Sequence, residues 1–153
     1  MDNENRAKTI AGLASRLIVG GIFIYAGYLK AVSPAEEFAY AIETYKVVPA
    51  GLAMFAAQTV PWLEIYLGVF LAAGVFTRYA ALAAGAMLLG FEGLLLQAII
   101  RKLPVTSCGC FGASKSNSLG YEFIQNLLFL ALAAMAWKYG GKISLDSAVE
   151  NRG

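Results

Sequence analysis

The sequence contains no histidine, only two cysteines and few charged residues. Lys, Arg, Asp and Glu together make up 14% of its 153 residues, hydrophobic residues make up 59%, and the mean hydropathy is +0.63. This scarcity of charge excludes an ordinary water-soluble domain of this length and indicates a protein of the lipid bilayer. The absence of histidine removes the most common metal ligand, and two cysteines one residue apart cannot form a disulfide framework between distant segments.

Four apolar runs are candidates for membrane spans, each of which needs about 20 helical residues. The first run, Leu17–Leu29, is short, but Arg16 can snorkel to the interface, so the helix is expected to begin near Leu13. A cleaved signal peptide is the alternative interpretation of this run, although no small-x-small cleavage site follows it. The other three expected spans are Val47–Phe76, Tyr79–Ile100 and Phe123–Trp137.

These spans predict an all-α fold, a single integral membrane four-helix bundle at residues 13–139 with cytoplasmic segments at 1–12 and 140–153. The distribution of Lys and Arg favours cytoplasmic termini, because more of them fall on the side of both ends. The connection between the third and fourth spans then faces the periplasm or the cell exterior. The residues on the side of the termini are Arg6, Lys8, Arg16, Arg78, Lys138, Lys142 and Arg152, against Lys30, Lys46, Arg101, Lys102 and Lys115 on the other.

A short interfacial helix is expected between the first and second spans. Ser33 is predicted as its N-cap, with Pro34 at the first helical position and Glu36 completing a capping box. This helix is interpreted either as a packing element or as a lid over the third connection. Its expected apolar face consists of Phe38, Ile42 and Tyr45.

Small residues are dense within the spans, which predicts close packing of the helices in a compact bundle. Pro61 is expected to kink the second span. Tyr25, Tyr28 and Lys30 are expected to anchor the end of the first span at the membrane interface. The small residues include Gly20, Gly21, Ala26, Gly27, Gly68, Ala72, Gly74, Gly85 and Gly90.

Two glutamates, Glu64 and Glu92, lie inside the expected second and third spans. A charged side chain at mid-membrane costs at least ~2.5 kcal/mol, so both are expected to face the interior of the bundle. In a functional interpretation they handle protons or form a polar site, for example for a quinone. In a structural interpretation they are neutral acids, or they bond Tyr66, Gln58 or Gln97 and specify helix pairing.

The third connection contains both cysteines, in the string Cys108-Gly109-Cys110-Phe111-Gly112. A disulfide between residues two apart closes a small, strained ring, which makes the bond more oxidising. Neighbouring Arg and Lys residues would favour the thiolate that attacks in thiol–disulfide exchange. Cys108 and Cys110 are therefore predicted as a redox pair, with the other three residues shaping the turn. Metal binding and idle thiols are the alternatives, and two thiolates supply only half of a typical zinc site.

Several strings occur in a distinctive order along the chain. Gly27-Tyr28-Leu29-Lys30 ends the first span, Pro61-Trp62-Leu63-Glu64 lies in the second, and the C-G-C-F-G string precedes the last. In this order they resemble the MauE/DoxX family of small redox-associated membrane proteins, and the C-G-C-F-G string points to the MauE branch. The resemblance implies a four-helix protein of the bacterial cytoplasmic membrane. It also implies a link to maturation of methylamine dehydrogenase, a disulfide-rich periplasmic enzyme, alongside a thioredoxin-like partner.

The sequence thus predicts a membrane thiol–disulfide exchange protein that works with a periplasmic thioredoxin-fold partner on exported proteins. A quinone is the one cofactor considered, and no resident metal and no nucleic-acid partner are expected. One alternative is a non-catalytic assembly or docking subunit whose cysteines only tether a partner. The other is a transporter of a small ligand or metal that uses Glu64, Glu92 and the thiols.

Overall fold

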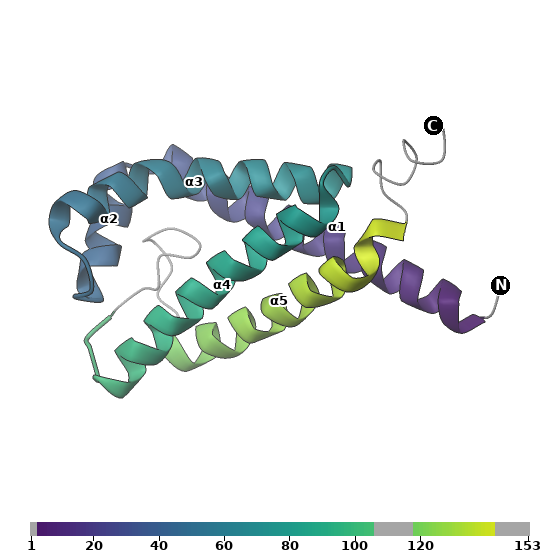
Figure 1. The fold of residues 1–153 in the computed structure, drawn as a ribbon. Helices are drawn as coiled ribbons and strands as arrows, with labels where there is room; N and C mark the ends of the chain where they lie inside the picture. Colours follow the sequence, from purple (N-terminus) through teal and green to yellow (C-terminus); the bar gives the residue numbers. More distant parts are fainter. Residues whose placement is uncertain (1–2, 106–117, 143–153) are drawn as a thin grey trace.

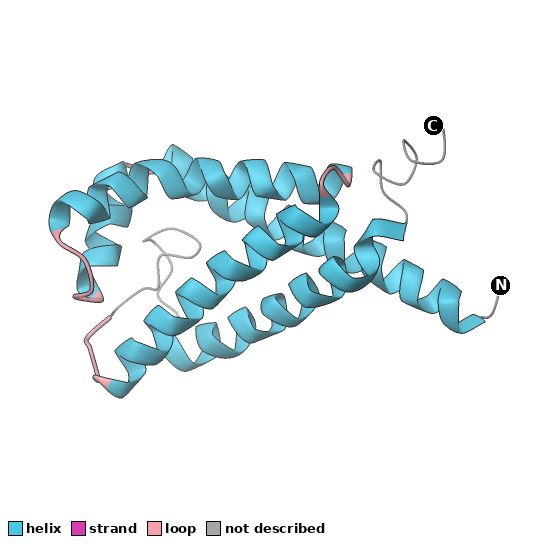
Figure 2. Cartoon of the chain, viewed as in Figure 1, coloured by secondary structure: helices cyan, strands magenta, loops and turns pink. Residues whose placement is uncertain are grey.

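Helices make up nearly all of the computed structural model, which describes residues 3–105 and 118–142. Within these ranges there is no β-strand, as the ribbon coloured by secondary structure makes plain (Figure 2). The all-α prediction is confirmed. The elements are α1 (Asn3–Val32), α2 (Ala35–Thr44), α3 (Ala50–Ala73), α4 (Thr77–Ile100), α5 (Leu119–Tyr139) and the short 3-10 helix η1 (Gly140–Lys142).

Four of the described helices, α1, α3, α4 and α5, are long and apolar enough to cross a membrane. They pack mainly as two pairs, α1 with α3 and α4 with α5, and α1 also packs against α5 (Figure 1). The buried cluster at the centre draws on all four helices and includes Val19, Phe23, Leu71, Ala84 and Ala133. The expected multi-pass four-helix membrane architecture is therefore confirmed.

Glycines bring α1 and α3 into direct backbone contact. A Cβ atom placed on Gly20 would lie 2.8 Å from the carbonyl oxygen of Gly68, and one on Gly68 would lie 2.6 Å from that of Gly20. About two turns after Gly20 on α1, a Cβ atom on Gly27 would lie 2.6 Å from the carbonyl oxygen of Pro61. Only glycine fits at such crossings, which confirms the predicted close approach for this pair. Gly90 on α4, by contrast, has open space beside it.

The short helix α2 packs against the beginning of α3. Phe38, Ala39 and Ala41 of α2 are buried together with Ala53 and Ala57 of α3, so the packing interpretation of this helix is confirmed. The expected capping box is wrong. The Ser33 hydroxyl donates to the Leu29 carbonyl at 3.0 Å, and Pro34 occupies the N-cap position with no side-chain cap. Because Ser33 directly follows the last residue of α1, its hydroxyl group can reach a carbonyl in the last turn of that helix.

Helix α1 begins ten residues earlier than expected, at Asn3 instead of near Leu13. Its polar first turns are stabilised locally by an ion pair between Lys8 and Glu4 at 2.6 Å and by a bond from Thr9 to the Asn5 carbonyl at 2.8 Å. Such contacts four residues apart support a helix that apolar patterning does not reveal. With 30 residues, α1 is about 45 Å long, well beyond the ~30 Å hydrocarbon core.

The turn between α3 and α4 is tight, as expected, and Gly74 makes it possible. Gly74 ends α3 in the left-handed conformation with φ of 74°, and both its own amide and that of Val75 donate to the Phe70 carbonyl. The predicted snorkelling of Arg16 is wrong. Arg16 is buried, lies against Gly74 and donates to the Gly140 carbonyl at 3.1 Å. A cation among helix C-termini is favoured by their unsatisfied carbonyls and partial negative charge, which outweighs exposure to water here.

Candidate functional site

The predicted redox residues, Cys108, Gly109, Cys110, Phe111 and Gly112, lie outside the described residues. The described helices on either side of them are α4, which ends at Ile100, and α5, which begins at Leu119. Both of these ends lie at the end of the bundle where α2 sits (Figure 1).

Glu64 faces the interior, as expected, and forms an ion pair with Lys30. The Lys30 ammonium donates to both carboxylate oxygens, at 2.6 and 2.7 Å, and the two side chains are 0% and 5% exposed. Lys30 was expected at the membrane interface, so that prediction is wrong. The carboxylate of α3 draws the lysine inward, because each charge would be far more costly in the bundle without the other. Tyr66, a suggested partner of Glu64, is instead largely exposed.

Aromatic rings complete the surroundings of the Lys30 ammonium. Its nitrogen lies 5.3 Å from the centre of the Phe38 ring and 5.6 Å from that of Phe91. Both distances fall in the range of cation–π attraction, which strengthens when water is excluded. The Lys30–Glu64 pair thus joins four elements, α1 and α3 through the ion pair and α2 and α4 through the rings.

Glu92 also faces the interior, and its partner is Asn126 on α5. The Asn126 amide donates to one Glu92 carboxylate oxygen at 2.7 Å and to the Leu88 carbonyl at 3.0 Å. The other Glu92 oxygen is buried and has no hydrogen-bond partner among the described residues. Gln97, proposed as a partner of the glutamates, instead donates to the Tyr45 carbonyl at 3.3 Å. Asn126 therefore joins α4 to α5, where it satisfies two buried acceptors.

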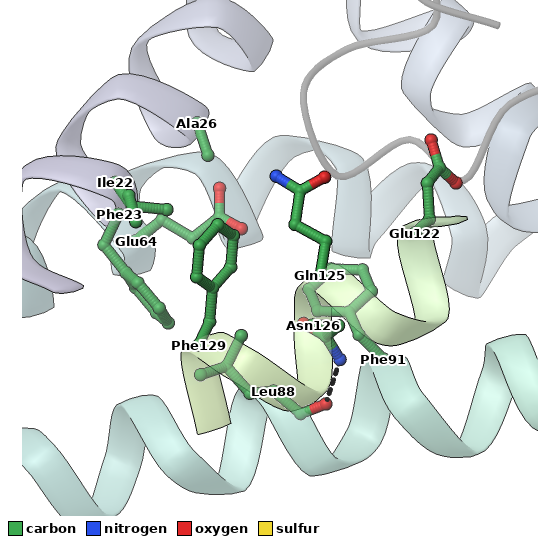
Figure 3. Close-up of a pocket in the computed structure, with 10 residues that line it drawn as sticks. All are labelled: Ile22, Phe23, Ala26, Glu64, Leu88, Phe91, Glu122, Gln125, Asn126 and Phe129. Atoms are coloured by element: carbon green, nitrogen blue, oxygen red, sulfur yellow. Dashed lines mark hydrogen bonds between the residues drawn. The ribbon is translucent and has the colours of Figure 1, made fainter. Parts of the chain in front are cut away.

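A cavity of about 40 Å³ lies between α1, α3, α4 and α5. Figure 3 shows Glu64 on one side of it and Gln125 and Glu122 on the other, with Asn126 close to Leu88. Its apolar wall includes three phenylalanine rings. The lining residues are Ile22, Phe23, Ala26, Glu64, Leu88, Phe91, Glu122, Gln125, Asn126 and Phe129.

Sequence reasoning missed four polar residues of this site: Lys30, Glu122, Gln125 and Asn126. A signal for the last three was present, because Glu122, Gln125, Asn126 and Phe129 are spaced as one helical face. The expected fourth span begins at Phe123, one residue after Glu122, so it omits the first residue of this polar face. Lys30 ends the family-like Gly27-Tyr28-Leu29-Lys30 string, but nothing in one sequence pairs it with Glu64.

The interior arrangement suits proton and hydrogen-bond chemistry better than metal binding. No group of three or more His, Cys, Asp or Glu side chains within the described ranges has the geometry to hold a metal ion. Both oxygens of Glu64 already accept from Lys30, and one oxygen of Glu92 accepts from Asn126. What the site offers is several carboxyl and amide groups around a small space inside four spanning helices.

Four spanning helices around a buried polar site define a small multi-pass helical membrane protein. More particularly, the chain belongs to the MauE family, because the family model described as methylamine utilisation protein MauE matches residues 8–139. A methylamine utilisation protein MauE of Paracoccus denitrificans is 28% identical over 121 residues, which cover 78% of this chain and 64% of that protein. One from Methylophilus methylotrophus is 26% identical over an aligned length of 155 positions that covers 97% of this chain and 80% of that protein. No solved structure matches the chain.

Proposed function

We propose that this chain is a membrane thiol–disulfide exchange protein in which Cys108 and Cys110 form the redox pair. The observation that carries the proposal is the position of its only two cysteines. They flank one glycine in the connection between α4 and α5 of a MauE-family membrane protein. A pair so close in sequence adds little stability as a cross-link, because it closes almost no chain, so its value lies in its reactivity.

The partner in this proposal is a periplasmic protein of the thioredoxin fold. Exchange begins when the thiolate of one protein attacks the disulfide of the other and forms a mixed disulfide. The second cysteine then displaces the partner, so that one protein gains a disulfide while the other gains two thiols. Two electrons and two protons pass between them, and no other oxidant or reductant is consumed.

We place the protein in the bacterial cytoplasmic membrane with both termini in the cytoplasm and the cysteines on the periplasmic side. An oxidising compartment supports this side for a redox pair, and so does the bias in Lys and Arg. The two relatives are named for methylamine utilisation, and we propose the same setting for this chain, with exported proteins as clients. The similarity to DoxX proteins remains a prediction.

A quinone is the membrane carrier that would connect such a pair to respiration, but the interior cavity is a poor place for its ring. A cavity of roughly 150 Å³ holds benzene, and the one between the helices is about 40 Å³. A substituted ring would enter only if the helices moved apart. We therefore propose thiol–disulfide exchange with a protein partner as the primary activity, with quinone reduction as a dependent hypothesis.

The test is a trapping experiment with Cys108→Ser, Cys110→Ser and the double variant in the native membrane. We expect each single variant to be inactive and one of them to accumulate a mixed disulfide with a protein of the thioredoxin fold, identified by mass spectrometry. The double variant controls for non-covalent association. Full activity of the double variant would leave only the docking-subunit alternative.

A further inference from the structure

The cavity between the spanning helices has a mainly apolar wall that carries four polar side chains, and it is too small for a large ligand. Glu64, Glu122, Gln125 and Asn126 all reach its wall. Apolar cavities stay empty, whereas polar ones of sufficient size hold water that makes two to four hydrogen bonds. Because one water needs about 10–15 Å³ on this measure, a volume of about 40 Å³ accommodates roughly three molecules.

The polar side chains around the cavity have hydrogen-bonding capacity left for such water. Both amide hydrogens of Asn126 are used by Leu88 and Glu92, so its carbonyl oxygen remains as an acceptor. Gln125 has both an acceptor and a donor group, and it faces Glu64 across the cavity in Figure 3. Each Glu64 oxygen accepts one bond from Lys30 and has a second lone pair.

We propose that this cavity holds a cluster of two or three water molecules that exchanges protons with the surrounding carboxyl groups. The site is then a buried proton-exchange site at the junction of α1, α3, α4 and α5. In each transfer a proton moves along a hydrogen bond between a water and a carboxylate oxygen, so that one group loses the proton that its neighbour gains. Glu64 and Glu122 line the cavity and are the carboxyl groups that would contact the cluster directly.

The charges beside the cavity favour water over a cation as its occupant. The Lys30 ammonium already compensates Glu64, so this carboxylate does not call for a second cation. The proposal does not depend on the cysteine chemistry, and the failure of either would leave the other standing.

The test measures water and proton exchange in purified protein in lipid nanodiscs. We expect NMR cross-peaks between water and the side-chain amides of Gln125 and Asn126. Ala26→Leu places a larger side chain in the cavity and should remove them. Ala31→Leu, on the exposed side of α1, is the matched control and should retain them.

Proton exchange is followed by infrared spectroscopy after transfer to deuterated buffer. A carboxylic acid band that Glu122→Gln removes should exchange at least tenfold more slowly in Ala26→Leu than in the wild type or the control. If Ala26→Leu does not fold, Leu88→Phe fills the cavity from α4, and its backbone carbonyl still accepts from Asn126. Absence of the water cross-peaks in the folded wild type, or equal exchange rates in a folded cavity-filled variant, would overturn the proposal.

Discussion

At the scale of single residues, the most consequential contact is the buried ion pair between Lys30 and Glu64. Removal of either side chain leaves the charge of the other buried without a counter-ion. Replacement of both by apolar side chains of similar size removes that penalty. A Glu64→Gln substitution would have two effects. This substitution removes a titratable group, but it also leaves the Lys30 ammonium without its carboxylate, so a loss of activity would not by itself indicate proton transfer.

We predict that Lys30→Met lowers the free energy of unfolding by about 3–5 kcal/mol, the usual cost of breaking a buried pair. Combination with Glu64→Leu should recover most of the loss. Lys8→Met removes the exposed pair with Glu4 and is the control, with an expected effect below about 1 kcal/mol. Reversible unfolding in mixed micelles measures all three. A loss for Lys30→Met no larger than for Lys8→Met would show that the ion pair does not stabilise the bundle.

Glu92 is the better residue for separating structure from chemistry. A glutamine at this position retains an oxygen that can accept from Asn126, so the bond between α4 and α5 survives. Glu64 is paired with the Lys30 ammonium, whereas Glu92 has no charged partner among the described hydrogen bonds. Glu92→Gln therefore leaves no buried cation without its carboxylate. This difference between the two glutamates could not be read from the sequence, in which both appear as single acids within apolar runs.

At the scale of helices, the contact between α1 and α3 depends on glycine where backbone meets backbone. We predict that Gly68→Ala costs about 1–3 kcal/mol, because its methyl group would meet the Gly20 carbonyl and the Ile24 amide. Neither backbone group can turn away as a flexible side chain would.

Gly90→Ala on α4 is the matched control for that prediction. This glycine has open space beside it, so the added methyl group should be neutral or should stabilise the helix by about 0.5–1 kcal/mol. Thermal unfolding of both variants in the same detergent makes the comparison. Equal changes in the two variants would mean that the crossing adapts and that close packing is not what holds α1 to α3.

The helices were predictable from the sequence because apolar length is a strong signal, but their ends and partners were not. The start of α1 at Asn3 rests on Lys8–Glu4 and Thr9–Asn5 contacts within a polar segment. The position of Ser33 depends on how few residues join α1 to α2. The inward turn of Lys30 depends on Glu64, on a different helix. Each of these outcomes depends on which residue a side chain contacts, and the sequence alone does not identify that residue.

At the scale of the whole molecule, the predicted orientation assigns the two ends of the bundle to different compartments. We predict that a membrane-impermeant maleimide, applied to intact spheroplasts after mild reduction, labels Cys108 or Cys110. The reason is that the connection between α4 and α5 would face the periplasm. Labelling is measured by the mass shift of the purified protein.

The control for orientation uses the opposite end of the bundle. Tyr79→Cys, in a background without Cys108 and Cys110, places a thiol at a position that is 74% exposed near the start of α4. It should react only after the membrane is permeabilised. The reverse labelling pattern at the two sites would show the opposite orientation. The cysteines would then face the cytoplasm, and the argument from an oxidising compartment would no longer hold.

The pairing of Lys30 with Glu64 also gives the biogenesis of this protein an order. These residues are 34 positions apart, which at about 5–20 residues per second is a delay of roughly 2–7 seconds during synthesis. Until α3 leaves the ribosome, the Lys30 ammonium has no carboxylate, and its place near the end of α1 lets it wait among the lipid head groups. We therefore expect α1 to reach its final depth in the bilayer only after α3 has been made, when Glu64 can pair with Lys30.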